Sequence, residues 1–222
     1  MTANTDLLNP AFKFLSDNFV SFLLLTVVFL IAYFAIYGIF SAIAGAVSFT
    51  SAYYGPFYYS AFGFNQLTYA IVQSIGTLLM SAAVLIFIAS LFETIALIKS
   101  KKFDFALAIG NGIKRALSNK NLLAIVLLLG FVGGFLSSYA GAGPDYLFYV
   151  NWLGFFVFGL FTAAYVGIAL GAQSSSHNAN FLQVFSKISG NAGAVLYVTL
   201  LASIVPVFGI ILLPLAVIIL ES

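Results

Sequence analysis

The chain has 222 residues, of which 63% are hydrophobic and only 6% are charged, and its formal net charge is +2. Soluble proteins carry about 25% charged residues, so this composition excludes a domain with a polar, water-facing surface. The absence of cysteine excludes disulfides, thiolate nucleophiles and cysteine-ligated metal sites.

Long charge-free runs predict an all-α integral membrane protein. No charged residue occurs between Asp17 and Glu93, and one crossing needs roughly 20 apolar residues. Backbone groups inside a bilayer must bond within their own segment, so each crossing is expected to be a helix. We predict a single transmembrane domain over residues 1–222, a bundle of five helices, with six as the alternative.

The N-terminal segment predicts a short helix on the membrane surface over residues 9–18. Asn9 is expected to cap this helix and Pro10 to be its first residue. Apolar residues follow at helical spacing, with Lys13 and Asp17 on the other face. This pattern is typical of helices that lie in the plane of the interface.

Two spans are predicted next, at about 20–46 and 67–98. The first is too long for a cleaved signal peptide, so we interpret it as a retained span. A tyrosine-rich loop over 48–65 is expected between them at the headgroup level, because amphipathic aromatic rings favour that depth.

The alternation of surface helix and span then recurs. A surface helix is predicted at about 103–118, where apolar and polar residues occupy opposite sides. It is followed by spans at about 122–139 and 146–172, which a tight link rich in glycine joins as an antiparallel hairpin.

The last part of the chain predicts another surface helix at about 179–189 and an apolar run over 192–220. That run exceeds the length of one crossing, and Pro206 and Pro214 interrupt it. One kinked span gives five crossings and a hairpin gives six; we favour five.

All basic residues fall on one side of the membrane if the predicted spans alternate. By the positive-inside rule, this side of the cell membrane is cytoplasmic and holds the N-terminus. The basic patch between the second and third spans is held at the headgroups by those spans, which favours anionic lipid over nucleic acid as its partner. The patch consists of Lys99, Lys101, Lys102, Lys114, Arg115 and Lys120.

Glu93 is the one acidic residue expected near membrane depth. An intramembrane carboxylate is a candidate for handling protons or cations. The alternative, which we favour, places Glu93 near the inner interface in an ion pair with a residue of the basic patch. The expected partners are Lys101, Lys102 and Arg115.

Small residues at a spacing of four occur in two of the predicted spans. They let the backbones of neighbouring helices approach closely, and packing within the chain is the interpretation that we favour. The residues are Gly38, Ala42 and Ala46 in the first span, and Ala163, Gly167 and Gly171 in the fourth.

The sequence predicts no catalytic residue, metal site or cofactor. His177 is the only histidine and stands in a polar, loop-like stretch with no second His or Cys to share a metal ion. The few carboxylates are scattered, and no group of nucleophile, base and acid is recognisable.

The order of surface helix, span, short outer loop, span and surface helix resembles that of multi-pass membrane families of unknown function in archaea and bacteria. Residues 105–131 and the Val-Pro-Val-Phe-Gly segment at 205–209 are the closest local similarities. The resemblance implies a helical membrane bundle and no catalytic residue.

These observations favour a non-catalytic membrane subunit, a scaffold or assembly partner for other membrane proteins or for further copies of the chain. The alternative is a small oligomeric channel or transporter for protons, cations or small solutes. In that case Glu93, Gln73 and Asn151 would face a shared pathway. An intramembrane enzyme acting on lipid is the weakest of the three hypotheses.

Overall fold

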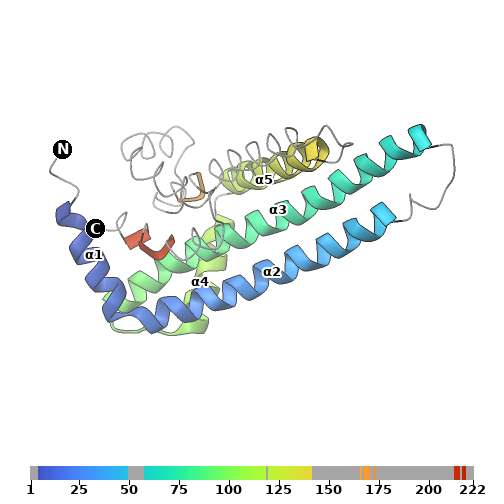
Figure 1. Cartoon of the computed structure of the whole chain (residues 1–222). Coiled ribbons are helices and arrows are strands. Elements are labelled where there is room, and N and C mark those ends of the chain that lie inside the picture. The colour runs from blue at the N-terminus through green and yellow to red at the C-terminus, as the bar shows by residue number, and fades with distance from the viewer. Residues whose placement is uncertain are drawn as a thin grey trace.

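The computed structural model describes residues 5–49, 58–118 and 120–141, and the isolated positions 166, 168–170, 173, 213–215 and 217–218. Every regular element in this part of the chain is an α-helix, as predicted. Figure 1 shows their arrangement. The helices are α1 (Thr5–Asp17), α2 (Phe19–Phe49), α3 (Tyr58–Lys99), α4 (Phe105–Ser118) and α5 (Lys120–Gly141).

Three of these helices are long and apolar enough to cross a membrane. The stretches that qualify are Phe19–Val47 in α2, Leu67–Lys99 in α3 and Lys120–Tyr139 in α5. They agree within two residues with the predicted spans 20–46, 67–98 and 122–139, so the described part is all-helical, with three candidate membrane-spanning helices.

The two later spans, at about 146–172 and 192–220, lie almost entirely outside the described residues, and the surface helix at 179–189 lies wholly outside them. Five spans, or six, therefore stay predictions.

The first helix begins earlier than predicted, and Pro10 lies inside it rather than at its start. Proline lacks the N–H that would donate to the carbonyl of Asp6, so the helix loses one hydrogen bond close to its end. The ring of Pro10 lies on the exposed side, and the next residue, Ala11, is buried. A single missing bond near the terminus has not stopped the helix here.

The predicted aromatic loop over 48–65 is too long. α2 continues to Phe49 and α3 already begins at Tyr58, directly after Pro56 and Phe57. Tyrosine rings can reach the headgroup level from the end of a long helix as well as from a loop. Amino-acid composition alone therefore did not distinguish a loop from the end of a long helix.

α3 is the central helix of the described structure. It contacts α2 on one side and α5 on the other, and α2 and α5 contact each other far less. Of the 18-residue apolar segment that qualifies α3 as a span, 67% is buried, against 22% for that of α2 and 28% for that of α5. The outer sides of α2 and α5 are therefore available to lipid or to other polypeptides.

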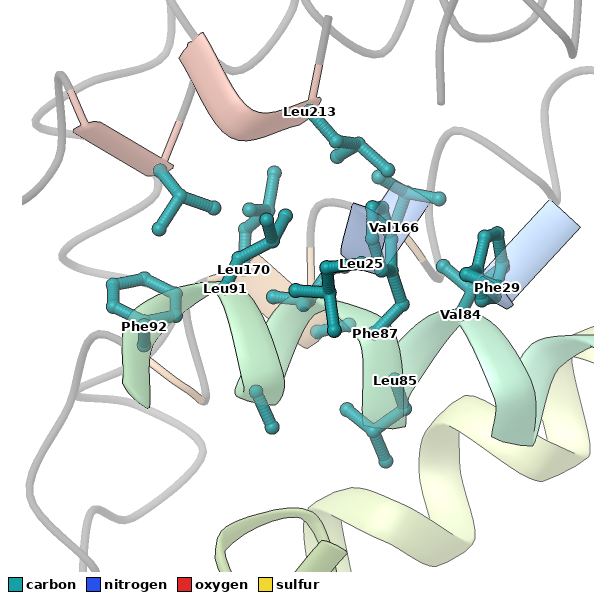
Figure 2. Packing of buried hydrophobic residues seen from close by; sticks show 14 of the residues in the cluster. Leu25, Phe29, Val84, Leu85, Phe87, Leu91, Phe92, Val166, Leu170 and Leu213 are labelled. Carbon is teal, nitrogen blue, oxygen red and sulfur yellow. The ribbon is translucent and has the colours of Figure 1, made fainter. Parts of the chain in front are cut away.

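The core lies around the second half of α3 (Figure 2). Phe29 of α2 stacks on Phe87 of α3, with ring centroids 4.3 Å apart and planes inclined by 15°. Leu91 lies nearby, and the described residues Leu170 and Leu213 from the C-terminal part of the chain complete the cluster. Segments far apart in the sequence thus meet on one stretch of α3.

The register between helices follows from two glycines of α5. Gly130 contacts Ser81, and Gly134 contacts Thr77, so α5 runs antiparallel to α3. Continuing this register places Lys120 about level with Leu91. We term this end, where α2 and α5 begin and α3 ends, the basic end.

Candidate functional site

The predicted ion pair of Glu93 is present, and its partner is Arg115. The Nη1 atom of Arg115 donates to Oε1 of Glu93 at 3.0 Å, and both side chains are 21% exposed. Arg115 is one of the three partners considered from the sequence. The pair links the last part of α3 to the C-terminal half of α4.

Arg115, the only arginine of the chain, makes two further contacts. Its Nη2 atom donates a hydrogen bond to the backbone carbonyl of Gln173, a buried residue. Its guanidinium lies 5.0 Å from the centre of the Phe92 ring, within the range of a cation–π contact. One side chain therefore joins α3, α4 and a residue beyond α5.

Glu93 lies at the edge of the apolar stretch rather than at its middle. Lys120 is about level with Leu91 in the register of α5 against α3, so the carboxylate is at the depth of the basic end. At this level α2 is close to its first residues. A partly exposed pair at such a depth keeps contact with water, which reduces the cost of burying two charges.

The turn between α3 and α4 sets the position of Arg115. α3 ends in a Schellman motif, in which the N–H groups of Lys101 and Lys102 donate to the carbonyls of Ile98 and Leu97 at 2.9 and 3.0 Å. Lys101 takes the left-handed conformation that this motif requires, with φ of 57°.

α4 then starts at a capping residue. Oδ1 of Asp104 accepts from the N–H of Leu107 at 3.0 Å, and the carbonyl of Asp104 accepts from Ala108 at 2.9 Å. Further along, Gly112 lies so close to Ser90 that a Cβ would be 2.7 Å from its Cα atom. This close approach brings the side chain of Arg115 within reach of Glu93.

The lysines of the basic patch lie at the surface. Each of Lys99, Lys101, Lys102, Lys114 and Lys120 is exposed, whereas Arg115 is only partly so. The structure therefore divides the predicted patch into one arginine that takes part in packing and five lysines around it.

Gln73 is far from Glu93. Both residues belong to α3, but they are about 30 Å apart along the helix axis and roughly 200° apart around it. The side chain of Gln73 is partly buried, and its backbone carbonyl accepts from the hydroxyl of Thr77. Asn151 lies outside the described residues. Gln73 and Glu93 therefore lie at different depths and on nearly opposite sides of α3, and a pathway shared by Glu93, Gln73 and Asn151 stays a prediction.

The small residues singled out in the first span do not pack within the described structure. Gly38 and Ala42 are exposed, and a Cβ built on Gly38 meets no described atom within 4 Å. Packing within the chain at these two positions therefore stays a prediction. Ala163, Gly167 and Gly171 lie outside it.

The close helix contacts are made by other glycines. A Cβ on Gly130 would lie 2.0 Å from Oγ of Ser81, and a Cβ on Gly134 would lie 2.0 Å from Oγ1 of Thr77. Gly130 and Gly134 are themselves four residues apart, the spacing known from tightly packed membrane helices. This signal is present in the sequence, although close packing was expected at other small residues.

The hydroxyl groups in this contact are bonded within their own helix. Thr77 donates to the carbonyl of Gln73 at 2.5 Å, and Ser81 donates to that of Thr77 at 2.8 Å. Ser74, also buried, donates to the carbonyl of Ala70. These side chains fill the space against the glycines, so the contact between α3 and α5 is close-packed at this point.

No catalytic arrangement emerges from the described geometry. Among the residues that the structure describes, no group of three His, Asp or Glu side chains is placed to hold a metal ion. His177 lies outside them. Comparisons with protein-family models, with curated proteins and with solved structures find no match to this chain. Function is therefore inferred from the geometry.

Proposed function

We propose that the chain is a non-catalytic membrane subunit that assembles with other membrane proteins or with further copies of itself. In this proposal it crosses the cell membrane several times, with its N-terminus in the cytoplasm and α1 and α4 at the inner interface. The observation that carries the proposal is the engagement of Glu93, the acidic residue on α3, by Arg115.

A carboxylate that transports protons or cations has to release one partner and take another. Glu93 is instead held by a guanidinium that also bonds the carbonyl of Gln173 and lies against Phe92. Movement of the carboxylate away from Arg115 would leave a cation without its anion in a partly buried place, at a cost of about 2 kcal/mol. This arrangement suits a fixed structural joint.

The outer side of α2 supports the assembly role. Gly38 and Ala42 lie one turn apart on the exposed surface, next to large apolar residues such as Ile39 and Ile43. Small residues flanked by large ones let a second helix approach closely, and such contacts drive helix association where lipid weakens the hydrophobic effect.

The test is to extract the protein gently from its native membrane and determine by mass spectrometry of the intact assembly what stays bound. We expect other polypeptides, or further copies, in reproducible stoichiometry. Gly38→Leu should reduce that association, because the leucine side chain would fill the space that a second helix needs for close approach. The matched control Ile39→Leu should retain the association. A lone protomer in every preparation would contradict the proposal.

A closed homo-oligomer would turn attention to the channel alternative. Glu93→Gln in reconstituted vesicles then separates the two functions. If Glu93 belongs to a fixed structural joint, the Glu93→Gln variant should show the same proton and cation flux as the unmodified protein. If the carboxylate lies in a transport pathway, the variant should lose that flux.

A further inference from the structure

α4 has three distinct sides. The side against α3 carries small residues at a spacing of four, Ala108, Gly112 and Ala116, all buried. A second side, adjacent to it around the helix, carries large apolar residues that are exposed: Ile113 at 39% and Leu117 at 53%. The third side carries Asn111, Lys114 and Ser118, and at its N-terminal end the exposed apolar side chain of Leu107.

This distribution differs from that in a helix packed on a water-soluble protein, although Phe105 and Ile109 of α4 are partly buried against the core. Such a helix buries its largest apolar side chains against the core and exposes its small and polar ones. In α4 the small residues are used to approach α3, and Gly112 allows contact with the backbone of Ser90. Ile113 and Leu117 are therefore left for a second apolar environment.

The depth of α4 identifies that environment. Gly112 meets α3 at Ser90, and Lys120 is about level with Leu91, so α4 meets α3 at the level where the apolar stretch of α5 begins. Figure 1 shows α4 lying across α3 rather than along it. Short helices between two spans, with one apolar and one charged side, are held in the interface of a leaflet.

The charges around α4 are complementary to anionic headgroups. Lys101, Lys102, Lys114 and Lys120 are exposed, and the nearby carboxylate of Asp104 accepts from an N–H at the start of α4. Lysine can extend its ammonium group to the headgroups while its methylene chain stays beside apolar neighbours. The side with Lys114 adjoins the side with Ile113 and Leu117.

We propose that the outward sides of α4, with the lysines at both of its ends, form a docking surface for the anionic phospholipids of the leaflet at the basic end. Ile113 and Leu117 enter the acyl region, and Lys102, Lys114 and Lys120 contact the headgroups. The surface does not require that the chain assemble with other polypeptides, so it is tested separately from the proposed function.

The first experiment measures depth. The chain has no cysteine, so Ile113→Cys and Ser118→Cys each introduce one labelling site for a fluorescent probe. In phosphatidylcholine vesicles that contain phosphatidylglycerol, a probe at position 113 should be quenched by lipids that carry a nitroxide on the acyl chain. A probe at position 118, on the polar side, should instead be quenched by aqueous iodide. Equal quenching of both probes by iodide would overturn the proposal.

The second experiment measures charge selectivity, as the preference of spin-labelled phosphatidylglycerol over phosphatidylcholine for the protein boundary. Replacing Lys102, Lys114 and Lys120 together by Gln should lower this preference at least about fivefold, since each lysine near an anionic surface contributes about that factor. The same three positions changed to Arg keep the charge and should keep the preference. An unchanged preference in the Gln variant would contradict a lipid-binding role.

Discussion

The guanidinium of Arg115 makes three contacts of different kinds at once. It pairs with Glu93, donates to the carbonyl of Gln173 and lies against the ring of Phe92. A planar fork with several donors suits this task, whereas an ammonium group is a single compact charge on a flexible stem. Arginine and lysine are therefore not equivalent at this position, although both carry one positive charge.

Replacing Arg115 by Ala should destabilise the protein by about 2 kcal/mol, because hydrogen bonds to charged groups contribute about 1.5–3 kcal/mol and Glu93 loses its partner. Arg115→Lys should recover only part of this loss. Reversible unfolding in mixed detergent micelles measures the change. Lys114→Ala, at the adjacent exposed position, is the control and should change stability little; an equal loss there would argue against a specific joint.

Lys101 adopts a backbone conformation that glycine adopts at lower cost. Its φ of 57° lies in the left-handed region, which disfavours a residue with a side chain by roughly 1 kcal/mol. Lys101→Gly should therefore stabilise the protein by about 0.5–1 kcal/mol in the same unfolding measurement. Lys102→Gly, one residue later, is the control and should give no gain.

Polar residues at the bends of the chain cap the helix that ends there. The side-chain amide of Asn18 donates to the carbonyl of Phe14, and the hydroxyl of Ser118 donates to that of Arg115. The ion pair of Glu93 could be predicted from the sequence, because its two partners lie on helices that one short turn connects. The contact with Gln173 could not, since its partner is 58 positions away.

At the scale of elements, the contact between α3 and α5 depends on the absence of side chains at Gly130 and Gly134. Gly134→Ala should force the two helices apart, because the added Cβ would lie 2.0 Å from Oγ1 of Thr77. We expect a loss of about 1–3 kcal/mol, as for other insertions into packed interiors. Gly38→Ala, at a position with open space around it, is the matched control.

Unfolding of both variants under identical conditions checks this expectation. A loss of similar size at Gly38 would mean that the effect comes from the helix itself and not from the contact with α5.

Helix positions were predictable, whereas helix ends and neighbours were not. The spans at 20–46, 67–98 and 122–139 followed from apolar length, which the bilayer thickness fixes. The prediction that the first helix starts at Asn9 was wrong, because Pro10 is tolerated within α1. The prediction of a loop up to residue 65 was wrong, because tyrosines are accommodated within α3. Local composition does not determine where a helix stops when the following residues can also be helical.

The apolar composition of a helix did not predict whether that helix is buried within the bundle. α2 and α3 are both strongly apolar, yet 67% of the 18-residue apolar segment of α3 is buried and only 22% of that of α2. Lipid and protein interior accept the same apolar side chains, so hydrophobicity does not separate them. The informative feature was the set of small buried hydroxyl residues of α3. Ser74, Thr77 and Ser81 lie on the side towards α5, and Ser90 and Thr94 lie on the opposite side, towards α4.

At the scale of the whole molecule, the proposed orientation places the basic end in the cytoplasm. The chain lacks cysteine, so Lys102→Cys provides a single site for a membrane-impermeant thiol reagent. In intact cells we expect no labelling at this site, and full labelling after permeabilisation. Tyr54→Cys, between α2 and α3, should react in intact cells. The opposite pattern would reverse the orientation.

The central place of α3 has a consequence for biosynthesis. α3 is made before α5, so its hydroxyl residues enter the membrane before the glycines that will cover them exist. Each of Ser74, Thr77 and Ser81 already donates to a carbonyl of its own helix, and none needs a partner from α5 for that bond. α3 can therefore reside in lipid as it leaves the insertion machinery, and it exchanges lipid for Gly130 and Gly134 once α5 arrives.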